Sequence, residues 1–204
     1  MVEKEVCELK EQSDEELMTG FQEGNSVGFE KLVARYNTPL YRFIYRLLKD
    51  EGESQDLVQE TFLRVYQNKS QYNPHYPFRT WIYSIASHLA INVLNSARRR
   101  RIISFFWNSS SHDGGQKAPL EEEVQDLRKN PEEEFSHRQA CENMQKAMNK
   151  LSPRQKIALT LNKMEGASYK EIARIMDINL AAVESLIFRA KQKIHRELRE
   201  KIQK

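Results

Sequence analysis

The side chains best suited to a chemical task lie between positions 54 and 101, and their types suit binding rather than bond cleavage. A turn-rich segment at 72–77 reads YNPHYP and is dense in aromatic residues. A long helical run follows it and ends in four arginines, Arg98–Arg101. Each base stacked on an aromatic ring is worth roughly 1–3 kcal/mol, and cations hold the strand's backbone. The segment is therefore a candidate site for a single strand of nucleic acid.

The helical run that starts at about Phe78 has two distinct faces. One is apolar at helical spacing and is expected to reach a core: Phe78, Ile82, Ile85, Leu89 and Val93. The other is aromatic at its start and polar after it: Trp81, Ser84, His88, Asn92 and Asn95. From the residues alone, two interpretations of the second face stay open, a nucleic-acid surface and an ordinary solvated face.

The helical run before it separates a polar stripe from a core stripe in the same way. The polar stripe stands at offsets of 0, 3, 4 and 7, which share one face of a helix: Asp56, Gln59, Glu60 and Leu63. The residues expected to enter a core are Val58, Phe62 and Val65.

The composition limits the class of protein. A chain of 204 residues with 30% charged side chains and 7 glycines is expected to form one or two small, largely helical domains. No apolar run approaches the roughly 18 residues needed to cross a bilayer, and the acidic start is unlike a signal peptide. Two cysteines make no disulfide framework. We expect a protein of the reducing cytoplasm.

The net charge of +3 conceals alternating blocks. Counted along the chain, residues 1–19 carry −5, residues 20–101 carry +5, residues 102–136 carry −5 and residues 137–204 carry +8. Basic blocks favour a polyanion, which would repel the acidic block between them. The pattern predicts two segments that favour a polyanion, joined by a segment that does not.

Local signals place the helix boundaries. Three capping boxes open helices at 13–16, 152–155 and 168–171. We expect one helix over 26–36, a second after Thr38-Pro39, and a third capped by Ser54. Ile102–Trp107 either continues the preceding helix or forms a strip that binds a partner.

The stretch from Ser168 to His195 has the layout of a helix-turn-helix, a short helix followed by a tight turn and a longer helix. In such modules the first residues of the second helix reach base edges in the major groove. The residues expected on its outward face are Ala181, Ala182, Glu184, Ser185, Phe188, Arg189 and Lys191.

Two stretches resemble a known family. DLVQETFLRVYQ followed by FRTWIYSIASH resembles region 2 of the sigma-70 family, in its extracytoplasmic-function (ECF) group, and residues 151–194 are similar to sigma region 4. The resemblance implies an all-α fold of two small helical domains joined by a flexible linker. It divides the chain into an acidic N-terminal tail (1–12), a region 2 domain (13–101), a flexible acidic linker (102–130) and a region 4 helix-turn-helix domain (131–204).

The resemblance also implies a function, that of a sigma factor which binds core RNA polymerase and opens promoters. Residues implied to bind the clamp helices of the polymerase largest subunit are Asp56, Gln59, Glu60 and Leu63. Residues implied to bind the −10 element are Asn73, Tyr76, Phe78, Arg79, Trp81, Ser84, His88 and Asn92. Residues implied to bind the −35 element are Lys163, Ser168, Tyr169, Ala181, Ala182, Glu184, Ser185, Phe188, Arg189 and Lys191.

Further partners implied are the polymerase flap, promoter DNA and an anti-sigma factor, which could hold the protein at the inner membrane face. The chain departs from the family at His88, where many relatives carry Asn, and at Ala181 and Glu184 in the recognition helix. These departures bear on base preference.

Two other functions compete with this one. A dimeric helix-turn-helix activator or repressor needs a ligand or dimerisation domain, and residues 14–101 show no such pattern. An enzyme needs a placed nucleophile or metal cluster. His137 and Cys141 could share a metal, but no second close pair completes four ligands. We expect no catalytic residue, metal, cofactor or small-molecule substrate.

Overall fold

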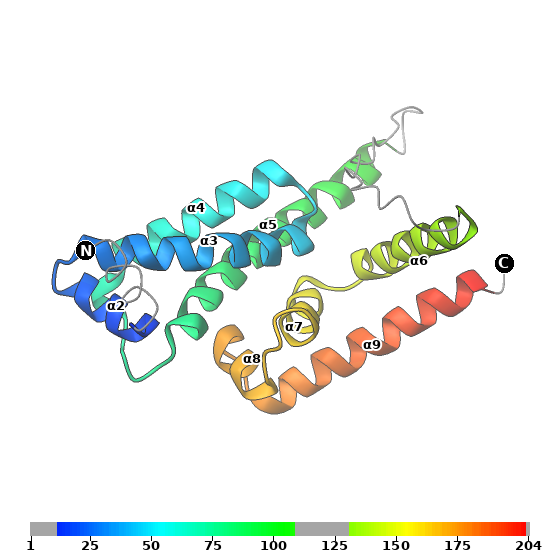
Figure 1. The fold of residues 1–204 in the computed structure, drawn as a ribbon. Helices are drawn as coiled ribbons and strands as arrows, with labels where there is room; N and C mark the ends of the chain where they lie inside the picture. The colour runs from blue at the N-terminus through cyan, green and yellow to red at the C-terminus, as the bar shows by residue number, and fades with distance from the viewer. Residues whose placement is uncertain (1–11, 109–130, 203–204) are drawn as a thin grey trace.

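The computed structural model describes residues 12–108 and 131–202, with side chains placed for residues 12–100 and 138–200. Every regular element in this part of the chain is helical, and Figure 1 shows the elements in two groups, α2–α5 and α6–α9. Their bounds are α2 Asp14–Gln22, α3 Ser26–Leu48, α4 Glu51–Gln67, the 3₁₀ turn η1 Lys69–Gln71, α5 Phe78–Asn108, α6 Pro131–Asn149, α7 Pro153–Lys163, α8 Tyr169–Met176 and α9 Leu180–Ile202. The expected all-α class with two helical units is confirmed.

Helix α3 is longer than the sequence predicts, because Pro39 lies inside one continuous helix instead of starting a new one. Proline inside a helix loses a hydrogen bond and costs about 3 kcal/mol. Pro39 is exposed, so water can reach the carbonyl left free. The buried stripe continues on both sides of it at helical spacing, through Leu32, Tyr36, Leu40, Phe43, Ile44 and Leu47. Burial of that stripe outweighs the cost of the proline.

Helix α4 begins earlier than expected, so the prediction that Ser54 caps it is wrong. Lys49 ends α3 in the left-handed conformation (φ 59°), and the Asp50 side chain accepts a hydrogen bond from the Glu53 backbone N–H at 2.8 Å. Ser54 is fully buried inside the helix, where its hydroxyl donates to the Asp50 carbonyl. Aspartate and serine both cap helices well. Asp50 is the N-cap of α4 because α3 ends at Lys49, directly before it.

The three predicted capping boxes are all present, at Ser13, Ser152 and Ser168. In the C-terminal group, Asp177 turns the chain with φ 49° between α8 and α9, which form the predicted helix-turn-helix. Val183 and Ile187 of α9 are buried against this unit.

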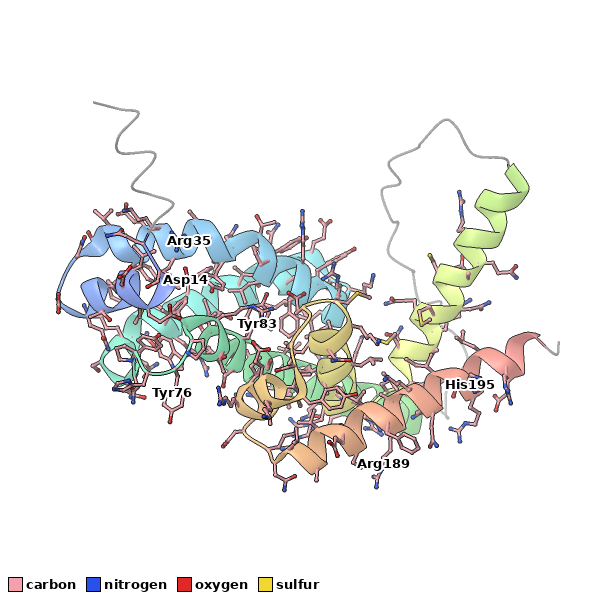
Figure 2. The ribbon with its side chains drawn as sticks, turned by 60° about the horizontal axis from the view of Figure 1, so that its bottom comes forward. Asp14, Arg35, Tyr76, Tyr83, Arg189 and His195 are labelled. Carbon is pink, nitrogen blue, oxygen red and sulfur yellow. The ribbon has the colours of Figure 1, made fainter. Side chains whose placement is uncertain are left out.

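The two groups pack on each other. Helix α5 contacts both α7 and α8, α3 contacts α7, and the buried apolar residues of both groups form one cluster. Figure 2 shows Tyr83 of α5 among the helices where the groups meet. The backbone of α5 continues as a helix through Asn108, so 102–107 extends α5.

None of the helices described in residues 12–108 and 131–202 has the length and apolarity needed to span a membrane.

Gly28→Ala tests the packing of α2 on α3. A Cβ at Gly28 would stand 2.4 Å from the Leu17 carbonyl oxygen, so the two helices must separate. We expect the free energy of unfolding, measured by urea denaturation, to fall by about 1–3 kcal/mol. Gly52→Ala is the control, because its Cβ meets only Asp50 Oδ1 at 3.6 Å, and it should be neutral or slightly stabilising. Equal stability of the two variants would refute the close approach.

Candidate nucleic-acid interface

The loop before α5 exposes one aromatic side chain and buries another. Tyr76 is 55% exposed and lies at the outer edge of the α2–α5 group (Figure 2), with exposed Asn73 on the same loop. Tyr72 is buried, and its hydroxyl donates to the Tyr76 carbonyl at 2.7 Å. The Tyr72 ring also packs on Trp81, with ring centroids 5.1 Å apart. Tyr72 thus supports the backbone from which Tyr76 projects.

Helix α2 holds this loop in place from the other side. The Gln22 amide nitrogen donates to the carbonyls of Lys69 at 2.7 Å and Tyr72 at 2.9 Å. The Glu15 carboxylate accepts from the Phe78 backbone N–H at 2.9 Å, at the first residue of α5. That N–H has no partner within the helix, and a negative charge is favourable at a helix N-terminus.

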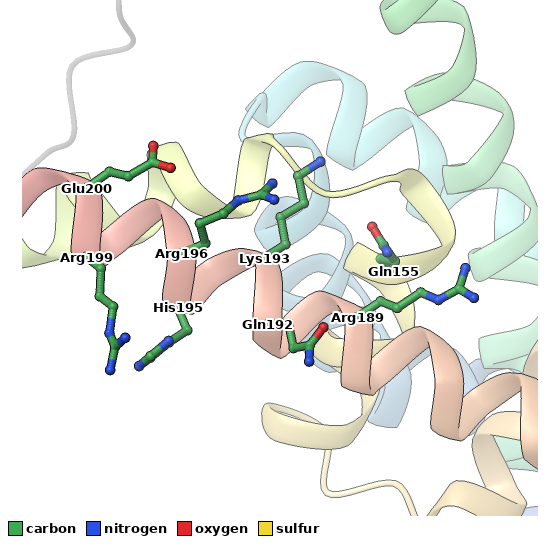
Figure 3. A pocket seen from close by; sticks show the side chains of 8 residues that line it. All are labelled: Gln155, Arg189, Gln192, Lys193, His195, Arg196, Arg199 and Glu200. Carbon is green, nitrogen blue, oxygen red and sulfur yellow. The ribbon is translucent and has the colours of Figure 1, made fainter.

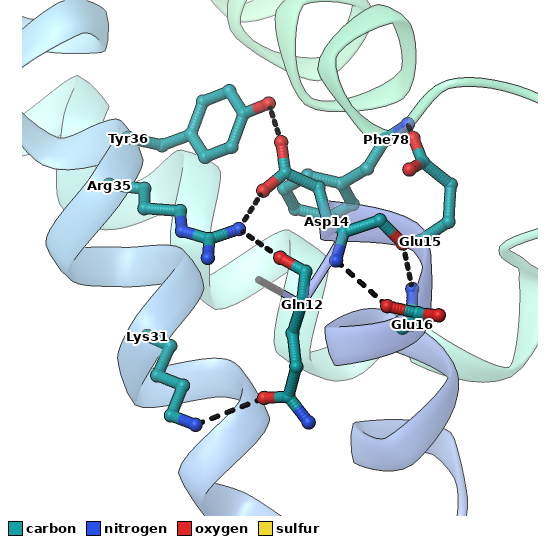
Figure 4. A network of polar contacts seen from close by, with 9 residues as sticks. Gln12, Asp14, Glu15, Glu16, Lys31, Arg35, Tyr36 and Phe78 are labelled. Carbon is teal, nitrogen blue, oxygen red and sulfur yellow. Dashed lines mark hydrogen bonds and ion pairs between the residues drawn. The ribbon is translucent and has the colours of Figure 1, made fainter. Parts of the chain in front are cut away.

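Asp14 ties α2 to α3 in the same region (Figure 4). Its carboxylate pairs with Arg35 at 2.6 Å and accepts from the Tyr36 hydroxyl. Burial is the main cause that raises the pKa of the Tyr36 phenol, and the Asp14 carboxylate raises it further. The phenol therefore stays protonated at neutral pH and continues to donate to Asp14.

Phe78 must be removed from the residues predicted to touch a base. Its ring is fully buried and packs edge-on against Tyr36 and Tyr72, at centroid distances of 5.3 and 5.9 Å. Phe78 begins the apolar stripe of α5. It is buried in the core, as is Ile82 of the same stripe.

The predicted polar face of α5 is open to solvent to different degrees. Trp81 and Ser84 are half-buried, and His88 and Asn92 are exposed one and two turns further on. His88 Nδ1 lies 2.8 Å from the Ser84 carbonyl, which can only accept, so Nδ1 carries a proton and Nε2 faces away from this bond. Arg79 is half-buried, and its guanidinium donates to the Glu165 carbonyl at 2.7 Å.

The predicted stripe of α4 is on the surface. Asp56, Gln59 and Leu63 are exposed, and Glu60 is partly exposed beside Arg64, with a 2.8 Å ion pair. Tyr66, which sequence reasoning missed, is 54% exposed and extends this stripe. It stands at offsets of 3 from Leu63 and 7 from Gln59, so the same helical spacing could have found it.

The helix-turn-helix exposes most residues of its predicted face. The exposed members are Lys163, Ser168, Ala181, Glu184, Phe188, Arg189 and Lys191. Tyr169, Ala182 and Ser185 are half-buried. Phe188 is 60% exposed, which leaves a large apolar ring beside two cations.

Three cations on α9, Lys193, Arg196 and Arg199, were missed by sequence reasoning. Arg189, Lys193, Arg196 and Arg199 line a surface hollow with His195, Gln155 and Glu200 (Figure 3). Starting at Arg189, successive cations are 4, 3 and 3 residues apart. This helical spacing could have revealed them. The hollow continues the basic side of α9 beyond the turn that carries Arg189.

Possible metal ligands do not gather anywhere in the described part of the chain, where no group of three or more His, Cys, Asp or Glu side chains forms. Cys141 is exposed on α6.

Comparison with known proteins assigns both groups of helices to one family. Residues 32–100 match sigma-70 region 2, and residues 133–194 match sigma-70 region 4. The ECF RNA polymerase sigma-E factor of Escherichia coli K12 is 30% identical over 182 residues, 89% of this chain and 92% of that protein. The RNA polymerase sigma-H factor of Pseudomonas aeruginosa is 28% identical over 190 residues, 93% of this chain and 96% of that protein. The chain belongs to the ECF group of the sigma-70 family.

Two solved structures share the fold of this ECF sigma factor. One is CnrH in complex with the cytosolic domain of CnrY, with a TM-score of 0.64, 21% identity and coverage of 93% of this chain and 99% of that one. The other is the sigma factor RpoE with the anti-sigma factor NepR from Bartonella quintana, with a TM-score of 0.55, 20% identity and coverage of 84% and 96%. The region 2 match spans α4 and the loop before α5, and the region 4 match spans α7, α8 and most of α9. Helix α2, which holds the loop, lies outside both matches.

Gln22→Ala should loosen the loop locally, because two backbone carbonyls lose their donor. We expect stability to fall by about 1–3 kcal/mol and hydrogen exchange to accelerate at residues 72–78. Gln67→Ala, at an exposed position, is the control and should change neither. Faster exchange spread evenly over the whole protein would contradict a role confined to the loop.

Proposed function

We propose that this chain directs core RNA polymerase to promoters by three separate surfaces. The α4 stripe from Asp56 to Leu63 binds the clamp helices of the polymerase largest subunit. The loop and polar face of α5 bind the −10 element, and the exposed face of α9 binds the −35 element. The observation that supports this most strongly is that region 2 and region 4 both match, and that most residues of each predicted surface are exposed or half-buried.

At the −10 element, Tyr76 supplies a ring on which an unpaired base can stack. Trp81 offers a second, half-buried ring, and His88 and Asn92 supply hydrogen-bonding groups along the same face. Stacking captures a base only after it has left the duplex. The rigid support beneath the loop, Tyr72 and α2, lowers the cost of ordering Tyr76 for that contact.

At the −35 element, the exposed start of α9 enters the major groove and its later turns follow the phosphates. Phe188 can contact a thymine methyl group, and Glu184 can accept from cytosine N4. Arg189 and Lys191 bind phosphate or guanine. The hollow lined by Lys193, Arg196 and Arg199 adds backbone affinity without sequence preference.

Opening the promoter costs more free energy than stacking on this chain can return, so it requires the polymerase. Opening a duplex costs about 1.4 kcal/mol per base-pair step, so a bubble of about ten steps costs about 14 kcal/mol. Two exposed or half-exposed rings return roughly 2–6 kcal/mol by stacking. The chain therefore captures bases that the holoenzyme exposes. It supplies binding and positioning, and the polymerase supplies the chemistry.

We also propose that an anti-sigma factor controls the protein in the cytoplasm, where RNA polymerase works. The solved structure of RpoE with the anti-sigma factor NepR, which shares this fold, supports that proposal. The same arrangement would allow an anti-sigma factor to hold the chain at the inner membrane face. The competing function, a dimeric activator or repressor, leaves the region 2 match over residues 32–100 without a role.

Run-off transcription tests the function directly. Core polymerase supplemented with this protein should produce a transcript with one defined start from a cognate promoter, found by mapping transcripts after overexpression. Core polymerase alone should produce none. An activator would instead need a holoenzyme that already contains another sigma factor, so stimulation only in that setting would refute the proposal.

Charge reversal at Asp56 and Glu60, both to Lys, tests the polymerase contact. We expect co-purification with core polymerase to be lost, because two attractive contacts become repulsive ones, while folding is retained since both positions are on the surface. Binding of region 4 to promoter duplex should not change. The control is reversal at Glu23 and Glu30, which are exposed elsewhere. Undiminished co-purification of the Asp56 and Glu60 variant would place the contact on another face.

A further inference from the structure

Glu184 is an unpaired acid on the face of α9 that is proposed to enter the major groove. It lies in the second turn of the helix and is exposed. Its carboxylate forms no ion pair or hydrogen bond with any side chain in the part of the chain that the structure describes. A helical ion pair is also ruled out, because no cation stands three or four residues away. Those positions hold Leu180, Ala181, Ile187 and Phe188.

The acid belongs to one stripe along α9 that we call the Glu184 stripe. Its members are Leu180, Glu184, Phe188 and Lys191, whose spacing of 4, 4 and 3 residues puts them on one face. Leu180 is 41% exposed and Phe188 is 60% exposed. Leu180 was missed by sequence reasoning. The carboxylate is therefore flanked by two exposed apolar side chains, and the cation follows two turns further on.

The inner face of α9 holds this stripe in a fixed direction. Val183, next to Glu184 in the chain, is buried, and so is Ile187 one turn later. The first turn is fixed by Asn179, whose side chain accepts from the Ala182 backbone N–H at 2.8 Å. A side chain carried by such a helix is already aligned when a base arrives, which lowers the cost of binding.

An unpaired acid is unfavourable on a surface that approaches DNA. Duplex DNA carries one negative charge per about 1.7 Å of its axis, and like charges brought together weaken a complex. The net charge of +8 on residues 137–204 attracts the duplex, and Glu184 acts against that attraction. Its repulsion is offset only where the carboxylate accepts a hydrogen bond from the DNA. Phosphates offer no donor, so the donor has to be a base.

Cytosine is the base that meets this requirement in the major groove. A carboxylate can only accept, and the cytosine edge presents the N4 amino donor. Guanine presents two acceptors and thymine one, which repel a carboxylate, and adenine sets its N7 acceptor beside its N6 donor. The apolar neighbours of Glu184 exclude water from such a bond, which strengthens it.

We propose that Glu184 makes a cytosine obligatory at one position of the −35 element, while it lowers the affinity of the protein for all other DNA. This deepens the proposed function and rests on it. Phe188 lies about 6 Å further along the helix axis, so it meets a base pair within two steps of 3.4 Å from that cytosine. Lys191 lies about 10 Å from Glu184 along the axis, where it reaches the phosphates at the edge of the groove.

The base requirement is tested by transcription with core polymerase and the full chain. The templates carry each of the four bases at every position of the mapped −35 element. At limiting protein, replacement of one cytosine should cost the wild type about tenfold or more in transcript. Glu184→Ala should abolish this requirement and keep the others. Glu184→Gln should shift it from cytosine towards adenine, because an amide pairs with adenine N6 and N7.

The loss of general affinity is tested by competition with an unrelated duplex. Holoenzyme with Glu184→Ala should bind that duplex several-fold more tightly than the wild type, because a repulsion is removed. Glu30→Ala removes an exposed acid of α3 and is the control, which should change neither this affinity nor the base requirement. Both variants should unfold at the same urea concentration as the wild type, since alanine suits an exposed helix position.

The outcomes separate this inference from the proposed function. An unchanged base requirement in Glu184→Ala overturns the inference, and so does the loss of a requirement for any base other than cytosine. Equal weakening at every template would assign Glu184 to a contact with the polymerase and would also overturn it. Wild-type transcription that ignores the −35 element, or no transcript at all, overturns the proposed function and this inference with it.

Discussion

Helix α5 must be buried on one side and free on the other, and the rest of the α2–α5 group follows from that constraint. Its apolar stripe is buried against α3 and α4, which fixes the helix without using its polar face. Burial of one large apolar side chain is worth about 1.5–3 kcal/mol. Phe78 and Ile82 alone therefore contribute as much as stacking two bases could return. The core can hold α5 steady while a strand binds to it.

The N-terminus of α5 shows why α2 is needed although it lies outside the region 2 match. Gln22 and Glu15 supply three hydrogen bonds at the loop before α5 and at its two flanks, to the carbonyls of Lys69 and Tyr72 and from the Phe78 N–H. A loop aligned in advance does not have to be ordered when a base arrives. Asp14 fixes α2 in turn through Arg35 and Tyr36, so an acidic first turn that reads as a simple capping signal also supports the candidate site.

Local signals in the sequence predicted most of the helices because caps and periodicity act over a few residues. Ser13, Ser152 and Ser168 were assigned correctly for this reason. Pro39 was interpreted wrongly because the local rule ignores a buried stripe that continues past it. Phe78 was placed on the DNA surface by the family resemblance, whereas its burial depends on Tyr36, 42 positions away. Glu165 gave no signal at all, since its partners are brought to it only by the packing of α7 and α8 on α5.

The same packing decides which predicted surfaces stay open to solvent. The α4 stripe and the outward face of α9 remain exposed. Arg79, which is predicted to bind the −10 element, is engaged where the two groups of helices meet, because its guanidinium donates to the Glu165 carbonyl at 2.7 Å. The start of α5 is therefore shared between the predicted −10 surface and the contact with the second group of helices.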